Sequence, residues 1–420
     1  AGALQFINVL SPTLTLTSAP KGPITSNVWS GTSTGTGNLS LTQTARMSIS
    51  SNHAFNCRTT VRGASELILN YSTGANATNN IIPGTLTLAG GRIQMRGGDS
   101  SVTDEVTSTL LESGATVISG SSSGTRLGLG QVTRQAGGIL EVRGASVVMD
   151  APSGLLGGYA TYATPELGTD VLNVTTWGTL DNNGLMTGLL NSDYETDAAS
   201  MSGSTFDVTA ASDPNGNVSF NWESSNNVNS LRFNTPNDQS SISVTLYDTD
   251  KIINDGGILV TKNIGARDIR IRDELDSPSG RSLTGGGGLI DDELIVHQHN
   301  TLGSLKIEVP IVDNPNSSPN ALTFSKTGQG KVILTGNNSY TGSTNIFAGS
   351  LQLGEGGGGG SLGSGAITNN GYLILNRSPG GTIAPEINGT GGVIKRCAGT
   401  ETLGGTSSNY TGTVSVLSGT

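Results

Sequence analysis

The feature of this sequence that most limits its fold is a short alternation of apolar and polar residues. It recurs along all 420 residues and is bounded by Gly, Asn, Ser or Asp. Examples are Thr85–Leu88, Arg92–Met95, Ile139–Val142 and Ile258–Val260. A period of two is typical of β-strands with one apolar face. No window keeps an unbroken apolar pattern at i, i+3, i+4 and i+7, so we predict an all-β protein.

The spacing of the turns separates the possible all-β folds. Gly-Gly and Ser-Gly links recur at intervals of roughly 7–12 residues over most of the chain, and at that length a closed sandwich or barrel would exhaust its core. A solenoid has no such limit, because each coil stacks only on its neighbours. Aromatic residues are only 4% of the chain, which argues against a large core built on rings. We therefore predict a parallel β-helix, that is, a β-solenoid.

Charge and hydropathy exclude several classes of partner. The formal net charge is −10, and no cluster of Lys and Arg follows one face, so we expect no nucleic-acid partner. No apolar run is long enough for a transmembrane helix. The chain begins at Ala1 without an initiator Met, which fits removal of a signal peptide. We expect a secreted protein, located extracellularly or at the outer cell surface.

One internal repeat can be read directly from the sequence. Asn338–Ile346, followed by Gly349, is echoed 70 residues later by Ser408–Val416, followed by Gly419. The repeated Asn-x-Tyr-Thr-Gly motif predicts a polar turn that presents a ring for stacking, with Gly at a tight corner. The repeat-motif turn residues are Asn338, Tyr340, Thr341, Gly342 and Gly349 in the first copy, and Asn409, Tyr410, Thr411, Gly412 and Gly419 in the second.

These residues also carry a resemblance to a known family. Residues 328–344 and 348–354 resemble the autotransporter-associated β-strand repeat of bacterial surface proteins, and residues 407–420 resemble a second, partial copy. More weakly, Ser230–Asn234, Gly256–Val260 and Leu294–His297 resemble the segment that precedes this repeat. The resemblance implies a right-handed parallel β-helix exported by a Gram-negative-type cell. It implies no activity.

Composition suggests a division into three parts. Residues 191–225 are poor in apolar triplets, so we interpret them as a polar excursion or seam in the solenoid. We therefore predict an N-terminal β-solenoid over 1–190 and a C-terminal β-solenoid with the repeats over 226–420.

The strongest enzymatic candidate is the segment Arg267–Asp273. In a strand, Ile269 and Ile271 would point inward, while Asp268, Arg270 and Arg272 would share the outer face. Carboxylates and basic residues on one face of a β-helix suit a polysaccharide lyase. An outer ladder of opposed charges that keeps the sheet soluble is the interpretation we prefer.

A second candidate is a metal site formed by Asp291, Asp292, Glu293, His297 and His299. The two His residues are two positions apart and would share one face of a strand, which is acceptable ligand geometry. No calcium-loop pattern accompanies them, so we prefer a solvated turn followed by a polar face. We therefore predict no catalytic residue, no metal ligand and no cofactor.

The only two Cys residues, Cys57 and Cys397, are far apart in sequence. In a continuous solenoid they could not approach within the Cα separation of about 7 Å that a disulfide allows. A disulfide between consecutive molecules and two buried single thiols both remain open. Both ends of the chain interrupt the strand pattern mid-repeat, without a polar capping unit. Uncapped solenoid ends would favour head-to-tail self-association.

Together these features predict a non-enzymatic, structural or adhesive protein: a surface stalk, sheath or filament subunit. One alternative is a β-helical polysaccharide lyase or hydrolase. Another is a module that binds surface glycans through Tyr159, Tyr162, Trp177 and Trp222 as exposed stacking platforms.

Overall fold

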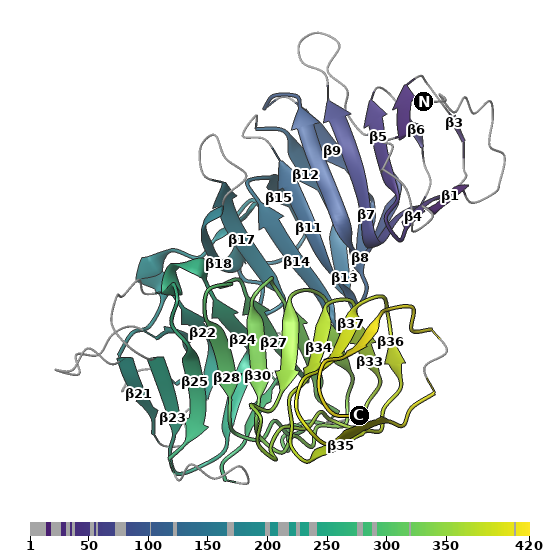
Figure 1. Cartoon of the computed structure of the whole chain (residues 1–420). Coiled ribbons are helices and arrows are strands. Elements are labelled where there is room, and N and C mark those ends of the chain that lie inside the picture. Colours follow the sequence, from purple (N-terminus) through teal and green to yellow (C-terminus); the bar gives the residue numbers. More distant parts are fainter. Residues whose placement is uncertain are drawn as a thin grey trace. The chain divides into compact units, whose positions relative to one another are not determined.

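The computed structural model divides into two compact units, Ala1–Leu189 and Leu190–Thr420 (Figure 1). The residues that the structure describes are 14–17, 27–30, 34–35, 38–50, 54–55, 58–71, 81–100, 102–120, 124–165, 172–197, 202–208, 218–223, 227–234, 242–274, 280–287, 292–318, 321–406 and 409–420.

The first unit is built from strands. They are β1 (Leu14–Thr17), β2 (Asn27–Ser30), β3 (Thr34–Gly35), β4 (Leu39–Thr42), β5 (Arg46–Ser50), β6 (Ala54–Phe55), β7 (Thr59–Tyr71), β8 (Thr85–Gly97), β9 (Thr103–Glu105), β10 (Ser108–Leu111), β11 (Gly114–Gly120), β12 (Arg126–Gly128), β13 (Gln131–Arg134), β14 (Gly138–Arg143), β15 (Ser146–Val148), β16 (Gly154–Leu155), β17 (Ala160–Pro165), β18 (Leu172–Leu180) and β19 (Met186–Gly188).

Parallel stacking builds most of the first unit. Its largest sheet runs β1-β4-β7-β8-β11-β14-β17, and each neighbouring pair along that path is parallel. Buried Leu67, Ile93, Ile118 and Val142 lie in register on successive strands. The pairing changes at β17, because β18 runs antiparallel to it and also pairs antiparallel with β16 and β19.

In its described residues, the second unit contains the remaining strands and the short 3₁₀ helices η1 and η3. They are η1 (Asn191–Asp193), β20 (Thr205–Asp207), β21 (Val218–Trp222), β22 (Val228–Phe233), β23 (Ile242–Leu246), β24 (Lys251–Val260), η3 (Lys262–Ile264), β25 (Ile269–Asp273), β26 (Leu283–Gly285), β27 (Glu293–Gln298), β28 (Ser304–Ile307), β29 (Thr323–Thr327), β30 (Lys331–Leu334), β31 (Thr344–Ile346), β32 (Ser350–Leu353), β33 (Ile367–Asn369), β34 (Tyr372–Leu375), β35 (Gly380–Ile383), β36 (Ile387–Asn388), β37 (Gly392–Lys395), β38 (Thr400–Leu403) and β39 (Val414–Val416).

Two nine-stranded parallel sheets form the body of this unit. The first, here called the A face, follows the path β20-β22-β24-β27-β29-β31-β33-β36, with β26 paired to β24. The second, the B face, runs β21-β23-β25-β28-β30-β32-β34-β37-β39. Apart from β26, strands of the two faces alternate along the chain from β20 to β34, so each of these coils adds one strand to each face, while β35 and β38 pair with each other in a separate sheet. Within 191–225, β20 pairs with β22 and β21 pairs with β23.

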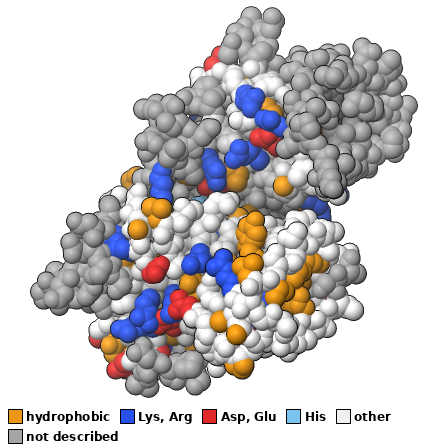
Figure 2. All heavy atoms as spheres, viewed as in Figure 1, with side chains coloured by type: hydrophobic (Ala, Val, Ile, Leu, Met, Phe, Trp, Pro, Cys, Tyr) orange, Lys and Arg blue, Asp and Glu red, His pale blue; other side chains and the backbone are white. Residues whose placement is uncertain are grey.

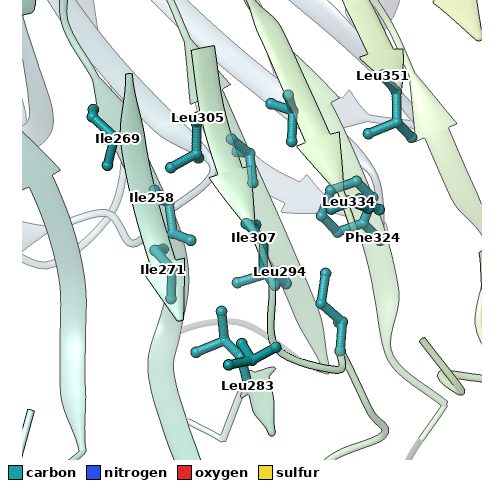
Figure 3. Packing of buried hydrophobic residues seen from close by; sticks show 14 of the residues in the cluster. Ile258, Ile269, Ile271, Leu283, Leu294, Leu305, Ile307, Phe324, Leu334 and Leu351 are labelled. Atoms are coloured by element: carbon teal, nitrogen blue, oxygen red, sulfur yellow. The ribbon is translucent and has the colours of Figure 1, made fainter. Parts of the chain in front are cut away.

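The core of the second unit is a set of aliphatic ladders. Val244, Ile271, Ile307, Leu334, Leu353 and Leu375 lie in register on six successive strands of the B face, and each is at most 1% exposed. Figure 3 shows part of this cluster, with Ile258, Leu294 and Phe324 of the A face in the same buried layer. Burying a Leu, Ile or Val side chain contributes about 1.5–3 kcal/mol, so each ladder stabilises the stacking of its coils.

Coil length varies along the second unit. Residues that bond across neighbouring coils late in the chain are 20 to 24 positions apart, as in Thr400 with Thr420 and Arg377 with Glu401. Asp268 and Ser304, also on neighbouring coils, are 36 positions apart. The predicted all-β solenoid with parallel strands is confirmed.

Candidate functional site

In the first repeat copy, Tyr340 is a core residue. Its side chain is 0% exposed, and its ring centroid lies 6.1 Å from that of Phe324. The hydroxyl shares a 2.8 Å hydrogen bond with Oγ1 of Thr344. Burial raises the pKa of Tyr340 to about 12. The ring therefore stacks inside the solenoid, where it cannot meet an external ligand.

The other turn residues of this copy fasten neighbouring coils. Asn338 accepts a hydrogen bond from the Ile311 N–H and donates one to the Ser361 carbonyl, both at 2.7 Å. The Thr341 N–H and hydroxyl both donate to the Asp313 carboxylate, at 2.8 Å.

Two glycines of the first copy have no room for a side chain. A Cβ on Gly342 would overlap the Leu322 carbonyl oxygen of the coil below. Gly349 has φ +64°, a left-handed conformation, and faces the Gly330 and Gly328 carbonyls. Gly342 lies between β30 and β31, and Gly349 lies between β31 and β32.

The second copy lies at a different corner. Tyr410 forms a parallel bridge with Gly389, which directly follows β36 of the A face, and β39 then joins the B face. In the first copy, by contrast, Tyr340 precedes β31 of the A face. Tyr410 is partly buried, and its hydroxyl donates to the Gly391 carbonyl at 2.8 Å.

The remaining residues of the second copy surround that corner. The Asn409 carbonyl accepts from the Gly389 N–H at 3.4 Å, and the Thr411 N–H donates to the Gly389 carbonyl at 2.9 Å. A Cβ on Gly412 would overlap the Gly391 carbonyl oxygen, and Gly419 has φ +75°.

Two lysines that the sequence motif did not include belong to the same repeats. Lys326 lies in register with the core residues Val296 and Ile346, and its ammonium donates to the Gly328 and Ala348 carbonyls at 2.5 and 2.7 Å. Burial lowers the pKa of Lys326 to about 7. Lys395 lies in register with Leu375 and donates to the Cys397 and Ser418 carbonyls. The sequence signal was a Lys at the end of each apolar run.

The charged segment Arg267–Asp273 forms an ion-pair network on the outer B face. Ile269 and Ile271 are 0% exposed, so the predicted alternation is confirmed. Arg270 donates two hydrogen bonds to the Glu308 carboxylate, at 2.9 and 2.8 Å. Lys306 bridges Glu308 and Glu355. Burial opposes ionisation of Glu308, but bonds from Arg270 and Lys306 prevail and lower its pKa.

This network matches the charge ladder preferred from the sequence. Asp273 is held by Arg281 at 2.6 Å, and Asp268 accepts hydrogen bonds from the Ser304 N–H and hydroxyl at 2.7 Å. The carboxylates that a lyase would need are thus occupied by neighbouring side chains.

The metal-site candidate falls partly on described residues. The His297 and His299 rings are stacked with centroids 6.3 Å apart, while Asp292 accepts a hydrogen bond from the Ser317 hydroxyl at 2.6 Å. Asp291 lies outside the described residues. Within the described part of the chain, no group of three or more His, Cys, Asp or Glu side chains could hold a metal ion.

The cysteine prediction concerns one described residue. Cys397 is a half-buried free thiol, with Sγ 3.8 Å from the Gly356 carbonyl oxygen. Cys57 lies outside the described residues.

The prediction of exposed aromatic rings for glycan binding is wrong for two of the four residues. Trp177 and Trp222 are both 0% exposed, because each ring fills an apolar layer that strand alternation alone could not assign to the inside. Tyr159 is half-buried and carries the Arg134 guanidinium 4.7 Å above its ring centroid. Tyr162 is also half-buried.

Comparisons with known proteins agree with the repeat positions. The model of the family "Passenger-associated-transport-repeat" matches residues 324–353 and 395–420. The chain is 27% identical over 410 residues to a protein described as "Adhesin BmaC autotransporter" from Brucella suis biovar 1 (strain 1330). That alignment covers 86% of this chain but only 11% of the relative's length.

No solved structure matches the chain significantly. Among the described residues, no helix is sufficiently long and apolar to cross a membrane. The resemblance inferred from the Tyr-Thr-Gly motifs is confirmed: the second unit of this chain carries two passenger-type repeats of the autotransporter kind.

Proposed function

We propose that this chain is a non-enzymatic, adhesive part of a protein located at the cell surface. The observation that carries the proposal is the pair of passenger-type repeats inside a parallel β-solenoid. The similarity to an autotransporter described as an adhesin supports the adhesive role. A solenoid suits this role because its coils stack into a long scaffold with large solvent-exposed faces.

An attachment assay tests the adhesive role. Beads that carry the purified full chain should adhere to cultured epithelial cells well above beads coated with serum albumin. Soluble chain should compete for the same sites and reduce attachment. Equal attachment of the two kinds of bead would contradict the proposal.

A turnover assay tests the non-enzymatic role. The full chain and an Arg270→Ala variant should both leave acidic polysaccharides intact, because the Arg270 guanidinium is already hydrogen-bonded to the Glu308 carboxylate. Unsaturated products from the unsubstituted chain that disappear with Arg270→Ala would instead establish the lyase alternative.

We also propose that the chain self-associates through exposed apolar side chains of β39 and the residue after it. Val414 and Val416 lie in register with Val393 and Lys395, which are buried, yet they are 55% and 57% exposed. Leu417 is 67% exposed beside them. Exposed apolar side chains that lie together favour association with a similar surface.

Sedimentation of the full chain tests self-association. Assemblies larger than a monomer should form and should disappear in Val416→Lys, whereas Leu302→Lys, which changes another exposed apolar side chain, should keep them. Reducing agent should shift the same profile if Cys57 and Cys397 join molecules. A monomer at all concentrations would exclude head-to-tail stacking.

A further inference from the structure

We propose that three side chains on the outer B face of the second unit, Lys331, Ser350 and Tyr372, form a binding platform for an anionic glycan. This inference rests on the proposed adhesive function and names the chemistry of its partner. The three residues are here called the KSY row. They belong to the strands β30, β32 and β34, which are consecutive neighbours in the sheet.

Strand register brings the KSY row together. Lys331 pairs with Ser350, and Ser350 pairs with Tyr372. Alternate residues Val332, Leu351 and Leu373 are 0% exposed in the core, so the KSY side chains point to the opposite, outer side. Neighbouring strands lie about 4.8 Å apart, so the row spans about 10 Å. That is comparable to the length of a disaccharide.

Tyr372 supplies a surface for stacking. It is 54% exposed, in contrast to the buried Tyr340. The next residue in the row is Gly392, and a Cβ there would lie only 2.9 and 3.0 Å from two carbons of the Tyr372 ring. The ring therefore rests over the Gly392 backbone, with one side supported by the sheet. An exposed ring held in this way suits the apolar face of a sugar.

The polar ends of the row are available to a ligand. The Lys331 ammonium makes no ion pair with any described residue. The Ser350 and Tyr372 hydroxyls likewise make no hydrogen bond within the described part of the chain. A few unengaged polar groups around an apolar surface are what fixes the orientation of a bound ligand.

Charge selects an anionic glycan over a neutral one. The chain as a whole carries a net charge of −10, but the outer B face beside the row carries Arg270, Arg272, Lys306 and Lys331 against Asp268, Glu308 and Glu355. Figure 2 shows Lys and Arg side chains gathered on this unit, with hydrophobic side chains exposed nearby. A sulfate or carboxylate would pair with Lys331 while its sugar ring stacks on Tyr372.

The test measures binding of three oligosaccharides to the full chain by calorimetry. The probes are a heparin oligosaccharide, a hyaluronan oligosaccharide and a neutral maltooligosaccharide. The two anionic probes should bind, and the neutral one should bind at least tenfold more weakly. Added salt should weaken binding of the anionic probes. No binding of either anionic probe, or equal binding of the neutral one, would overturn the proposal.

Paired variants then locate the site. Tyr372→Ala should weaken binding of the anionic probes about 3- to 10-fold, whereas Tyr372→Phe should restore most of it because the ring remains. Lys331→Gln should weaken binding several-fold and reduce its salt dependence. Leu302→Ala and Lys262→Gln change an exposed apolar residue and an exposed Lys outside the row, so they should bind as the unsubstituted chain does.

Two outcomes distinguish this inference from the proposed function. If Tyr372→Ala and Lys331→Gln bind the anionic probes as well as the unsubstituted chain, the KSY row is not the site. If beads adhere to cells while the chain binds no glycan, adhesion stands and the glycan platform is overturned. Far-ultraviolet circular dichroism of each variant confirms that the solenoid is folded.

Discussion

Tyr340 and Tyr410 stand in two copies of the same motif, but the first is a core side chain and the second is a half-buried corner residue. The 70-residue offset between them is the cause. Late coils repeat at 20 to 24 positions, so 70 residues amount to three coils and a fraction. The second copy is thereby displaced by one corner, and its strand β39 joins the B face, whereas β31 of the first copy joins the A face.

This difference shows that the repeat specifies a strand-turn-strand unit. It does not specify at which corner of the coil that unit lies. Both copies keep a Gly under a neighbouring carbonyl and a Lys that caps corner carbonyls. The two copies differ in how their surroundings pack around the tyrosine ring. The expected effects of substitution therefore differ most at the tyrosines.

The largest expected effect is at the buried ring. Tyr340→Ala should lower the free energy of unfolding by about 3–5 kcal/mol, because it leaves a ring-sized cavity beside Phe324. The matched Tyr410→Ala should lower it by about 1 kcal/mol. Urea unfolding of the full chain, followed by circular dichroism, measures both. Equal losses would show that the two corners are energetically equivalent.

A smaller effect is expected at the corner glycine of the first copy. Gly349→Ala should cost about 2–3 kcal/mol, because φ is +64° and a Cβ would approach the Gly330 carbonyl oxygen to 2.5 Å. Gly419→Ala should cost less, since β39 pairs with β37 alone among the described strands.

Gly357→Ala is the control for this series, because nothing lies within 4 Å of its Cβ position. It should change stability by less than about 0.5 kcal/mol. The same urea unfolding experiment applies. A loss at Gly357 as large as that at Gly349 would exclude corner geometry as the cause.

The third prediction concerns the pH dependence that Lys326 gives the first copy. Its pKa is about 7 when folded and 10.5 when unfolded. Between these values the unfolded chain binds more protons, so stability should increase as pH rises from about 7 to 10.5. The slope is at most about 1.4 kcal/mol per pH unit.

Lys326→Met tests this prediction, since a thioether in that core-facing position cannot titrate. The variant should show a smaller increase in stability than the unsubstituted chain in urea unfolding at pH 7, 8 and 9. Lys395→Met is the matched variant in the second copy. An unchanged pH profile in Lys326→Met would contradict the assignment.

The smallest expected effect is the loss of a single hydroxyl. Tyr340→Phe keeps the ring but removes the bond to Thr344, so it should cost about 1 kcal/mol. Tyr410→Phe should cost less, because water can replace the protein partner at a half-buried corner. Thermal unfolding that ranks the two variants in the opposite order would contradict this view.

Several features of the fold could be predicted from the sequence because they depend on local alternation. Ile269 and Ile271 were assigned to the inside and Arg270 to the outside from their spacing alone, and their burial confirms it. Gly342 and Gly349 were expected at tight turns from the backbone freedom of glycine, but only Gly349 has a positive φ, and at Gly342 the Leu322 carbonyl leaves no room for a Cβ. The solenoid was predicted from the spacing of the turns, because a closed sandwich or barrel would exhaust its core over a chain of this length.

Other features could not be predicted, because they depend on which coils become neighbours. Trp177 and Trp222 were expected on the surface and are buried, since only packing decides which side of a strand is covered. The Arg270–Glu308 pair joins residues 38 positions apart across a long coil, which no local pattern indicates. The core position of Lys326 was missed for a similar reason, because its ammonium reaches carbonyls of the next coil.

The sequence by itself determined the strand period, the corner glycines and the positions of the two repeats. Tertiary structure alone decided the corner at which each repeat lies, the burial of Tyr340 and the alignment of Lys331, Ser350 and Tyr372. The physical reason is that side-chain alternation is a property of each strand. Register between strands instead depends on the length of every intervening loop, so that bonded residues of neighbouring coils are 20 positions apart at Thr400 and Thr420 but 36 apart at Asp268 and Ser304.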